Sequence, residues 1–259
     1  MNIELAEGDR AAGESFRKLA EAADEFEAYK NPHASRIARI ADALAARFRL
    51  SRADRTSIVF AALLHDVGEM TMRRDYIGRA GPLNSAERAD LQRHPVIGEQ
   101  EAARASADRA VQLLVRWHQE WWDGSGYPDA LRGEQIPLGA RILRAADAYA
   151  ALTDARPFRP AGTEAEARKH LTLWAGLEFD PRVVSALLSL EALPELRAYT
   201  RAPLPEVEET RADASVVEAD TGVVKEDAAV VEENAAVVEA PDADVAEVAH
   251  AGASEPENQ

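Results

Sequence analysis

Apolar residues return every three or four positions along most of residues 1–201, with short polar loops between the apolar stretches. Ile58, Ala61 and His65, for example, occupy positions i, i+3 and i+7 of one helical face. Asn84 and Glu87 have the spacing of a capping box, which indicates a helix start. Strand-like alternation is nearly absent. The sequence therefore predicts an all-α fold, a compact helical bundle with helices over 15–29, 33–48, 54–65, 84–93, 96–104, 107–119, 138–153, 164–174 and 181–190.

The acidic residues are concentrated at the C-terminal end of the chain. The formal net charge is −16, and residues 202–259, with 16 acidic and 2 basic side chains, contribute −14 of it. This segment has no aromatic residue, so it has little apolar surface to offset the entropy of ordering it. Val-Val pairs recur every seven residues from Val216, as in a coiled coil, but they lack the three-and-four spacing of a coiled-coil seam. We predict a disordered acidic tail over 201–259, with a coiled coil as the alternative.

Composition excludes several classes of protein. The chain has no cysteine, which rules out disulfides and thiolate metal sites. Its longest apolar run, residues 58–64, is far shorter than the roughly 20 residues of a membrane span. The N-terminus does not resemble a signal peptide. We therefore expect a cytoplasmic protein that spans no membrane, and the acidic charge argues against a nucleic-acid polymer as partner.

Several polar residues lie where the helical periodicity calls for apolar ones. His65 completes one apolar stripe, His118 completes another, and Asp147 lies on an apolar turn. Each of them alone is more often a hydrogen-bonded core residue than a ligand. A buried carboxylate is costly without a compensating cation, however, and one metal site could satisfy all three residues.

The motifs around these residues resemble the HD-GYP family, a branch of the HD superfamily of metal-dependent phosphohydrolases. The resemblance extends over about residues 29–190. It is carried by the His65-Asp66 pair, by the segment 120–128 that ends in Gly126-Tyr127-Pro128, and by the segments 131–137, 141–147, 156–159 and 179–181. It implies a domain over 31–200 with an HD-type helical bundle, preceded by an N-terminal helix within 1–30.

The resemblance also implies a function, a metal site and a substrate site. The implied function is hydrolysis of cyclic di-GMP to pGpG or GMP by a hydroxide that bridges two divalent ions, which are usually iron or manganese in this family. Asp66 and His65 are the expected catalytic residues, with Asp66 as the bridging carboxylate. Gly126, Tyr127 and Pro128 are expected to form a rim loop that fits the substrate or docks a signalling protein. Arg156 and Arg159 are expected to bind the substrate, or equally to form a surface salt bridge. The implied metal ligands are His33, His65, Asp66, His94, His118 and Asp147.

Four positions depart from the general family pattern, and a fifth departs from that of the three-metal members. Gln119 stands where a second histidine is usual, so that a single ion is an alternative to two. Glu69 stands where lysine is usual and either repels the substrate phosphate or points outward without effect. Ala150 and Trp121 replace an aspartate and an arginine, and Tyr29 replaces the glutamate of three-metal members. These departures leave a second hypothesis open: a catalytically degenerate module that binds a nucleotide or a partner protein in signalling without turnover.

Overall fold

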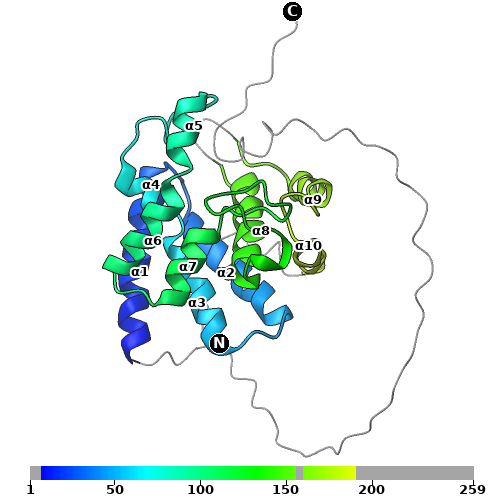
Figure 1. Cartoon of the computed structure of the whole chain (residues 1–259), viewed down its shortest axis with the longest axis horizontal. Helices are drawn as coiled ribbons and strands as arrows, with labels where there is room; N and C mark the ends of the chain where they lie inside the picture. The colour runs from blue at the N-terminus through cyan, green and yellow to red at the C-terminus, as the bar shows by residue number, and fades with distance from the viewer. Residues whose placement is uncertain (1–6, 156–159, 191–259) are drawn as a thin grey trace, which may run out of the picture.

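Helices make up nearly all the regular structure of the chain, as the computed structural model shows for residues 7–155 and 160–190 (Figure 1). The all-α prediction is confirmed. Within these residues the only bridge between extended segments joins Ala175 to Phe179. The helices are α1 (Glu7–Phe26), α2 (His33–Arg47), α3 (Arg52–Leu64), α4 (Val67–Met72), α5 (Ser85–Leu91), α6 (His94–Arg104), α7 (Arg109–Trp117), α8 (Leu138–Thr153), α9 (Glu164–Leu173) and α10 (Pro181–Leu188), with a 3-10 turn, η1 (Gly133–Gln135), between α7 and α8.

The core of the bundle forms where α2, α3 and α8 pack together. Ile37 and Leu44 of α2, Leu63 of α3 and Leu143 of α8 are almost completely buried. α1 covers one side of α3, while α9 and α10 lie on the far side of α8 (Figure 1). α7 packs against both α3 and α8, and the C-terminal end of α3 lies close to the middle of α8. Among the described residues, no helix combines the length and the apolar character needed to cross a bilayer.

Two elements differ from the predicted helices. The first helix begins at Glu7 rather than at residue 15 and ends at Phe26, before Ala28, whose φ of 63° is incompatible with a continuing α-helix. α4 was not predicted, because its six residues are too few to display a helical period. The predicted capping box at Asn84 is confirmed at the start of α5. The predicted tail, 201–259, lies outside the described residues.

Candidate metal centre

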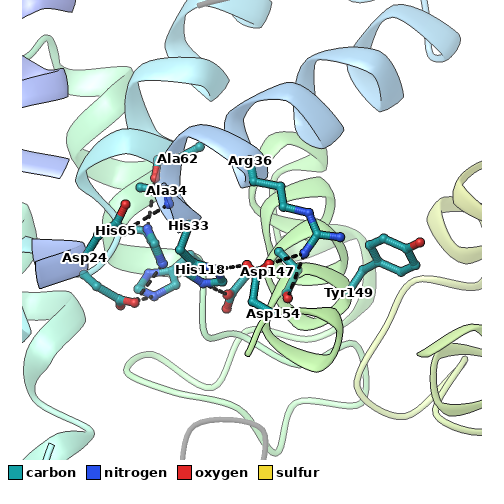
Figure 2. Close-up of polar contacts among 12 residues, drawn as sticks. Asp24, His33, Ala34, Arg36, Ala62, His65, His118, Asp147, Tyr149 and Asp154 are labelled. Carbon is teal, nitrogen blue, oxygen red and sulfur yellow. Dashed lines mark hydrogen bonds and ion pairs between the residues drawn. The ribbon is translucent and has the colours of Figure 1, made fainter. Parts of the chain in front are cut away.

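All six predicted ligands meet inside the bundle, and five of them come from helix ends. Figure 2 shows four of the six: His33, His65, His118 and Asp147. His33 and His94 are the first residues of α2 and α6, while His65 and His118 directly follow α3 and α7. Asp66 precedes α4, and Asp147 lies within α8. Helix ends have backbone groups without partners in the helix, which local side chains can use. This placement fixes the orientation of the imidazole rings.

Three of the four rings are oriented by a backbone carbonyl three residues earlier: for His65 and His118 it lies in the helix that the residue follows, and for His94 it is the carbonyl of Leu91, the last residue of α5. The Nδ1 atoms of His65, His94 and His118 lie 2.9, 2.9 and 2.7 Å from the carbonyl oxygen three residues earlier. A carbonyl oxygen only accepts hydrogen bonds, so each Nδ1 carries the proton. In the neutral ring, Nε2 then presents its lone pair to the interior, the arrangement that metal-binding histidines have.

His33 is oriented by a residue far away in the sequence. Its Nδ1 lies 2.8 Å from Oδ2 of Asp154, and Arg36 donates to Oδ1 of the same carboxylate at 2.6 Å. Burial raises the pKa of the Asp154 carboxyl, but His33 and Arg36 outweigh burial and hold it below its usual value. Asp154 was not among the predicted site residues. Its position, seven residues after Asp147 and so on the same helical face, is the sequence signal that could have identified it.

The six residues form two groups that could each hold one cation. The first group is His33, His65 and Asp147, and the second group is Asp66, His94 and His118; within each group the ligand atoms lie within 4.8 Å of one another.

Asp66 lies between the two groups. Its Oδ2 is 2.7 Å from Nε2 of His65, and its Oδ1 is 3.5 and 3.6 Å from Nε2 of His94 and His118. One carboxylate oxygen thus faces each group, which is the geometry that a bridging carboxylate requires.

The centre is buried, and its polar atoms are poorly satisfied. Within the described part of the chain, Nε2 of His33 is buried without a hydrogen-bond partner. Nε2 of His65 and Oδ2 of Asp66 have only each other, in an ion pair that needs a proton on His65, and Oδ1 of Asp66 comes no closer than 3.5 Å to an imidazole nitrogen. Buried polar groups are normally paired, so such a cluster needs a physical explanation. A divalent cation supplies one, because imidazole nitrogen and carboxylate oxygen suit Fe, Mn and Zn.

Charge within the centre supports the same conclusion. Burial alone raises the pKa of Asp66, but the neighbouring histidines, His65 above all, hold it well below its ordinary value. Burial alone would lower the pKa of His65, but the Asp66 carboxylate raises it to about 10. Without a metal, a proton on His65 therefore balances the Asp66 charge.

Glu69 and Gln119 both lie against the second group. Glu69 is 5% exposed, and its Oε1 is 3.8 Å from Nδ1 of His94, so the alternative that it points outward is wrong. Gln119 is buried and places its amide nitrogen 3.2 Å from Nε2 of His118. Glu69 and Gln119 thus both touch predicted ligands of the second group directly.

The other departures have structural contacts of their own. Tyr29 stacks on the His33 ring, with centroids 3.8 Å apart. Trp121 packs edge-on against Trp174. Ala150 is buried, and its carbonyl oxygen accepts a hydrogen bond from Arg36.

The Gly126-Tyr127-Pro128 segment lies against the centre. The Tyr127 ring is perpendicular to the His94 ring, with centroids 6.1 Å apart, and the Tyr127 amide donates to the Gln119 carbonyl. Gly126 is required there, because a Cβ atom would lie 2.2 Å from the Trp121 nitrogen. Glu120 holds the next part of the loop by accepting from two backbone amides. The predicted substrate residues Arg156 and Arg159 lie outside the described residues.

Comparison with known proteins identifies relatives of this chain. Residues 19–183 match a family model described as HD domain. The cyclic di-GMP phosphodiesterase response regulator RpfG of Xanthomonas campestris is 38% identical over 178 residues, which cover 68% of this chain and 47% of that protein. The 3'3'-cGAMP-specific phosphodiesterase 2 of Vibrio cholerae is 33% identical over 191 residues, which cover 73% of this chain and 36% of that protein. The chain thus spans less than half the length of these two relatives.

Solved structures share the fold. A cyclic GMP-AMP specific phosphodiesterase of V. cholerae, V-cGAP3, superimposes with a TM-score of 0.56 at 18% identity, covering 70% of this chain and 49% of that one. Bd1817, an HDG"Y"P protein from Bdellovibrio bacteriovorus, has a TM-score of 0.53 at 20% identity, covering 69% of this chain and 60% of that one. With the His65-Asp66 pair and the Gly126-Tyr127-Pro128 segment in place, the chain belongs to the HD-domain family, in its HD-GYP branch.

Proposed function

We propose that this chain is a metal-dependent phosphodiesterase that hydrolyses a cyclic dinucleotide, cyclic di-GMP, to pGpG or GMP. The observation that carries the proposal is the convergence of four imidazole Nε2 atoms and two carboxylates into two groups joined by Asp66. Phosphodiester hydrolysis requires stabilisation of charge on the phosphate oxygens and a nucleophile at neutral pH. A pair of divalent ions supplies both kinds of chemistry when it is bound.

In this proposal the ligands of each ion come from one of the two groups. The first group would hold one ion and the second group the other, with Asp66 shared between them. An iron or manganese pair suits these nitrogen and oxygen donors. Because the Nδ1 hydrogen bonds fix the rings in advance, the site needs little rearrangement to accept the ions.

The rim of the centre supplies groups for the substrate. Burial raises the pKa of the Tyr127 hydroxyl, so Tyr127 stays protonated at neutral pH and can donate a hydrogen bond to a phosphate or a base. Arg156 and Arg159 are proposed to bind phosphate oxygens, which suit the planar guanidinium group. The cyclic dinucleotide is proposed because the relatives are named for such substrates.

A second function is favoured by one observation. Glu69 is buried beside His94, on the side of the centre next to Tyr127, and its carboxylate would repel an anionic substrate. A module that binds a nucleotide or a partner protein without hydrolysing it would tolerate this charge. The two functions share the metal centre and differ in turnover.

The deciding experiment measures metal content and hydrolysis on the same sample. We expect at least one equivalent of metal per chain by elemental analysis, and linear product from cyclic di-GMP when Mn²⁺ or Fe²⁺ is supplied. Asp66→Asn should abolish both metal binding and hydrolysis. Less than one equivalent after reconstitution would overturn the metal centre. Metal without product would select the non-hydrolysing module, and Glu69→Lys combined with Gln119→His should then restore turnover.

A further inference from the structure

Gln119 occupies the edge of the second group, where a family member usually has a second histidine. An amide can approach a metal ion with its carbonyl oxygen, which is a ligand, or with its NH2 group, which is not. The orientation of this one side chain therefore decides whether the second group has a fourth protein ligand.

Arg144, one turn before Asp147 on α8, sets this orientation. Its Nη1 donates to Oε1 of Gln119 at 2.9 Å, and the same atom lies 3.5 Å from Oδ2 of Asp147. A guanidinium has only donors, so the Gln119 oxygen must face Arg144. The NH2 group then faces His118, whose Nε2 accepts from it at 3.2 Å because Nδ1 of that ring donates to Val115.

Glu178 keeps Arg144 in place. Its carboxylate accepts a hydrogen bond from Nη2 of Arg144, and both residues are buried, Glu178 at 2% and Arg144 at 4% exposure. Separating a buried ion pair is costly, so the guanidinium has no easy alternative position. If the Gln119 amide turned over, its NH2 group would face the donors of Arg144, and both hydrogen bonds of the amide would be lost.

We propose that Arg144 and Glu178 are a positioning pair that turns the Gln119 carbonyl away from the second group, which makes that group the weaker of the two metal sites. The amide then opposes metal binding, because an ion on His118 must displace the Gln119 hydrogen bond. The first group has no such amide donor, since Nε2 of His33 and Nε2 of His65 accept no hydrogen bond from any described residue. The proton on Nε2 of His65 is held by Asp66, which lies between the two groups, so an ion in either group opposes it and it does not distinguish them. The inference rests on the proposed metal centre.

The test is calorimetric titration of the metal-free full chain with Mn²⁺, with electron paramagnetic resonance to distinguish paired from isolated Mn²⁺. In the wild type we expect two binding steps whose Kd values differ at least tenfold. Gln119→Met has a similar volume without the amide. It should lower the Kd of the second step about threefold to tenfold, the range that one net hydrogen bond contributes. The electron paramagnetic resonance signal of paired Mn²⁺ should then appear at a lower Mn²⁺ concentration. If the Gln119 carbonyl were a ligand, the same substitution would weaken the second step.

A double-mutant cycle isolates the positioning pair. Arg144→Met combined with Glu178→Gln removes the ion pair as a unit and releases the Gln119 amide to turn. In this background the carbonyl becomes available as a ligand, so Gln119→Met should weaken the second step. The sign of its effect therefore reverses between the two backgrounds. Should the double variant not fold, the sign of Gln119→Met in the wild type decides alone.

A matched control lies on the same helix. Arg141→Met with Asp180→Asn removes a partly buried ion pair, 2.6 Å long, whose arginine lies one turn before Arg144, and should leave both Kd values unchanged. A change like that of the Arg144 variant would assign the effect to packing and overturn the inference. Two steps of equal affinity, or a weaker second step in Gln119→Met, would also overturn it while leaving the proposed function intact. Failure to bind Mn²⁺ at all would instead overturn the proposed function.

Discussion

Each imidazole of the centre is controlled by the contact on its far side. For His65 and His118 that contact is a carbonyl of the helix turn just before the residue, so the orientation is built in as soon as the helix forms. For His94 it is the carbonyl of Leu91, at the end of α5, and so it depends on the short turn between α5 and α6. For His33, at the start of its helix, the contact is the Asp154 carboxylate, which only tertiary packing brings near. This ring is thus the one that a single distant substitution can release.

Asp154→Ala should therefore weaken metal binding at the first group. Loss of a carboxylate that orients a ligating histidine typically costs about 10- to 100-fold in metal affinity. Asp154→Asn should cost less, because its amide oxygen still accepts from Nδ1 of His33. The measurement is the Kd of the first Mn²⁺ by calorimetry. Asp42→Ala is the control, since Asp42 is a buried carboxylate of α2 paired with Arg55 and should change stability but not the Kd. Equal Mn²⁺ affinity in Asp154→Ala and the wild type would contradict this role.

At the scale of elements, the centre depends on how closely α4 approaches α6. Gly68 lies in α4 directly against the first turn of α6, and a Cβ atom there would lie 2.1 Å from the His94 carbonyl oxygen and 2.8 Å from the Gly98 nitrogen. Both contacts are to backbone, which cannot move aside as a flexible side chain can. The short helix after the His65-Asp66 pair therefore packs only with glycine at this position.

Gly68→Ala should separate α4 from α6 and displace Asp66 relative to His94. We expect a loss of at least about 2 kcal/mol in the free energy of unfolding, the usual range for overpacking, together with weaker Mn²⁺ binding. Urea unfolding and calorimetry measure the two effects. Gly78→Ala is the matched control, because its nearest neighbour, the Phe26 carbonyl oxygen, would be 3.7 Å away. If both variants behaved alike, close packing at Gly68 would not be what holds the centre.

The helices were predictable from the sequence because their apolar residues recur with a helical period. The six converging residues were predictable because they belong to the motifs of a known family. The 3.6-residue period located α2, α3, α7 and α8, and the motifs pointed to residues that the fold then brought together. α4 was not predictable, since six residues show no period. The contact of Asp154 with His33 joins residues 121 positions apart in the sequence, and that of Arg144 with Gln119 joins residues 25 positions apart. Both depend on tertiary packing, which no local pattern encodes. The burial of Glu69 likewise depends on the way α4 packs.

For the whole molecule, the centre couples stability to pH and to metal. The buried Asp66 carboxylate needs a positive partner, and in the metal-free protein that partner is protonated His65. A metal ion that binds there replaces the proton, so the two ligands compete for the same charge. Stability in the metal-free and the metal-bound protein should therefore depend on pH in different ways.

The metal-free protein should lose stability as the pH rises from about 6.5 towards 10. Burial opposes the charge on His65, but Asp66 raises its folded pKa to about 10, above the ordinary 6.5. A raised pKa contributes stability that is complete below the unfolded pKa and is lost as the pH rises through the folded one. Saturating Mn²⁺ should flatten this slope and add about 2.7 kcal/mol at 100 times its Kd. Urea unfolding at pH 6.5, 8 and 9.5, with and without Mn²⁺, measures both effects.

Two variants assign this slope to the centre. Asp66→Asn removes the charge that holds the proton on His65, so the metal-free slope above pH 6.5 should become shallower. His170→Gln should leave it unchanged, because burial lowers the pKa of His170 to about 4 and this ring is already neutral throughout the range. A steep slope that persists in Asp66→Asn, or one that disappears in His170→Gln, would place the titrating group elsewhere. If instead the slope follows Asp66 and responds to Mn²⁺, proton and metal compete for the same buried carboxylate, as the two groups around Asp66 require.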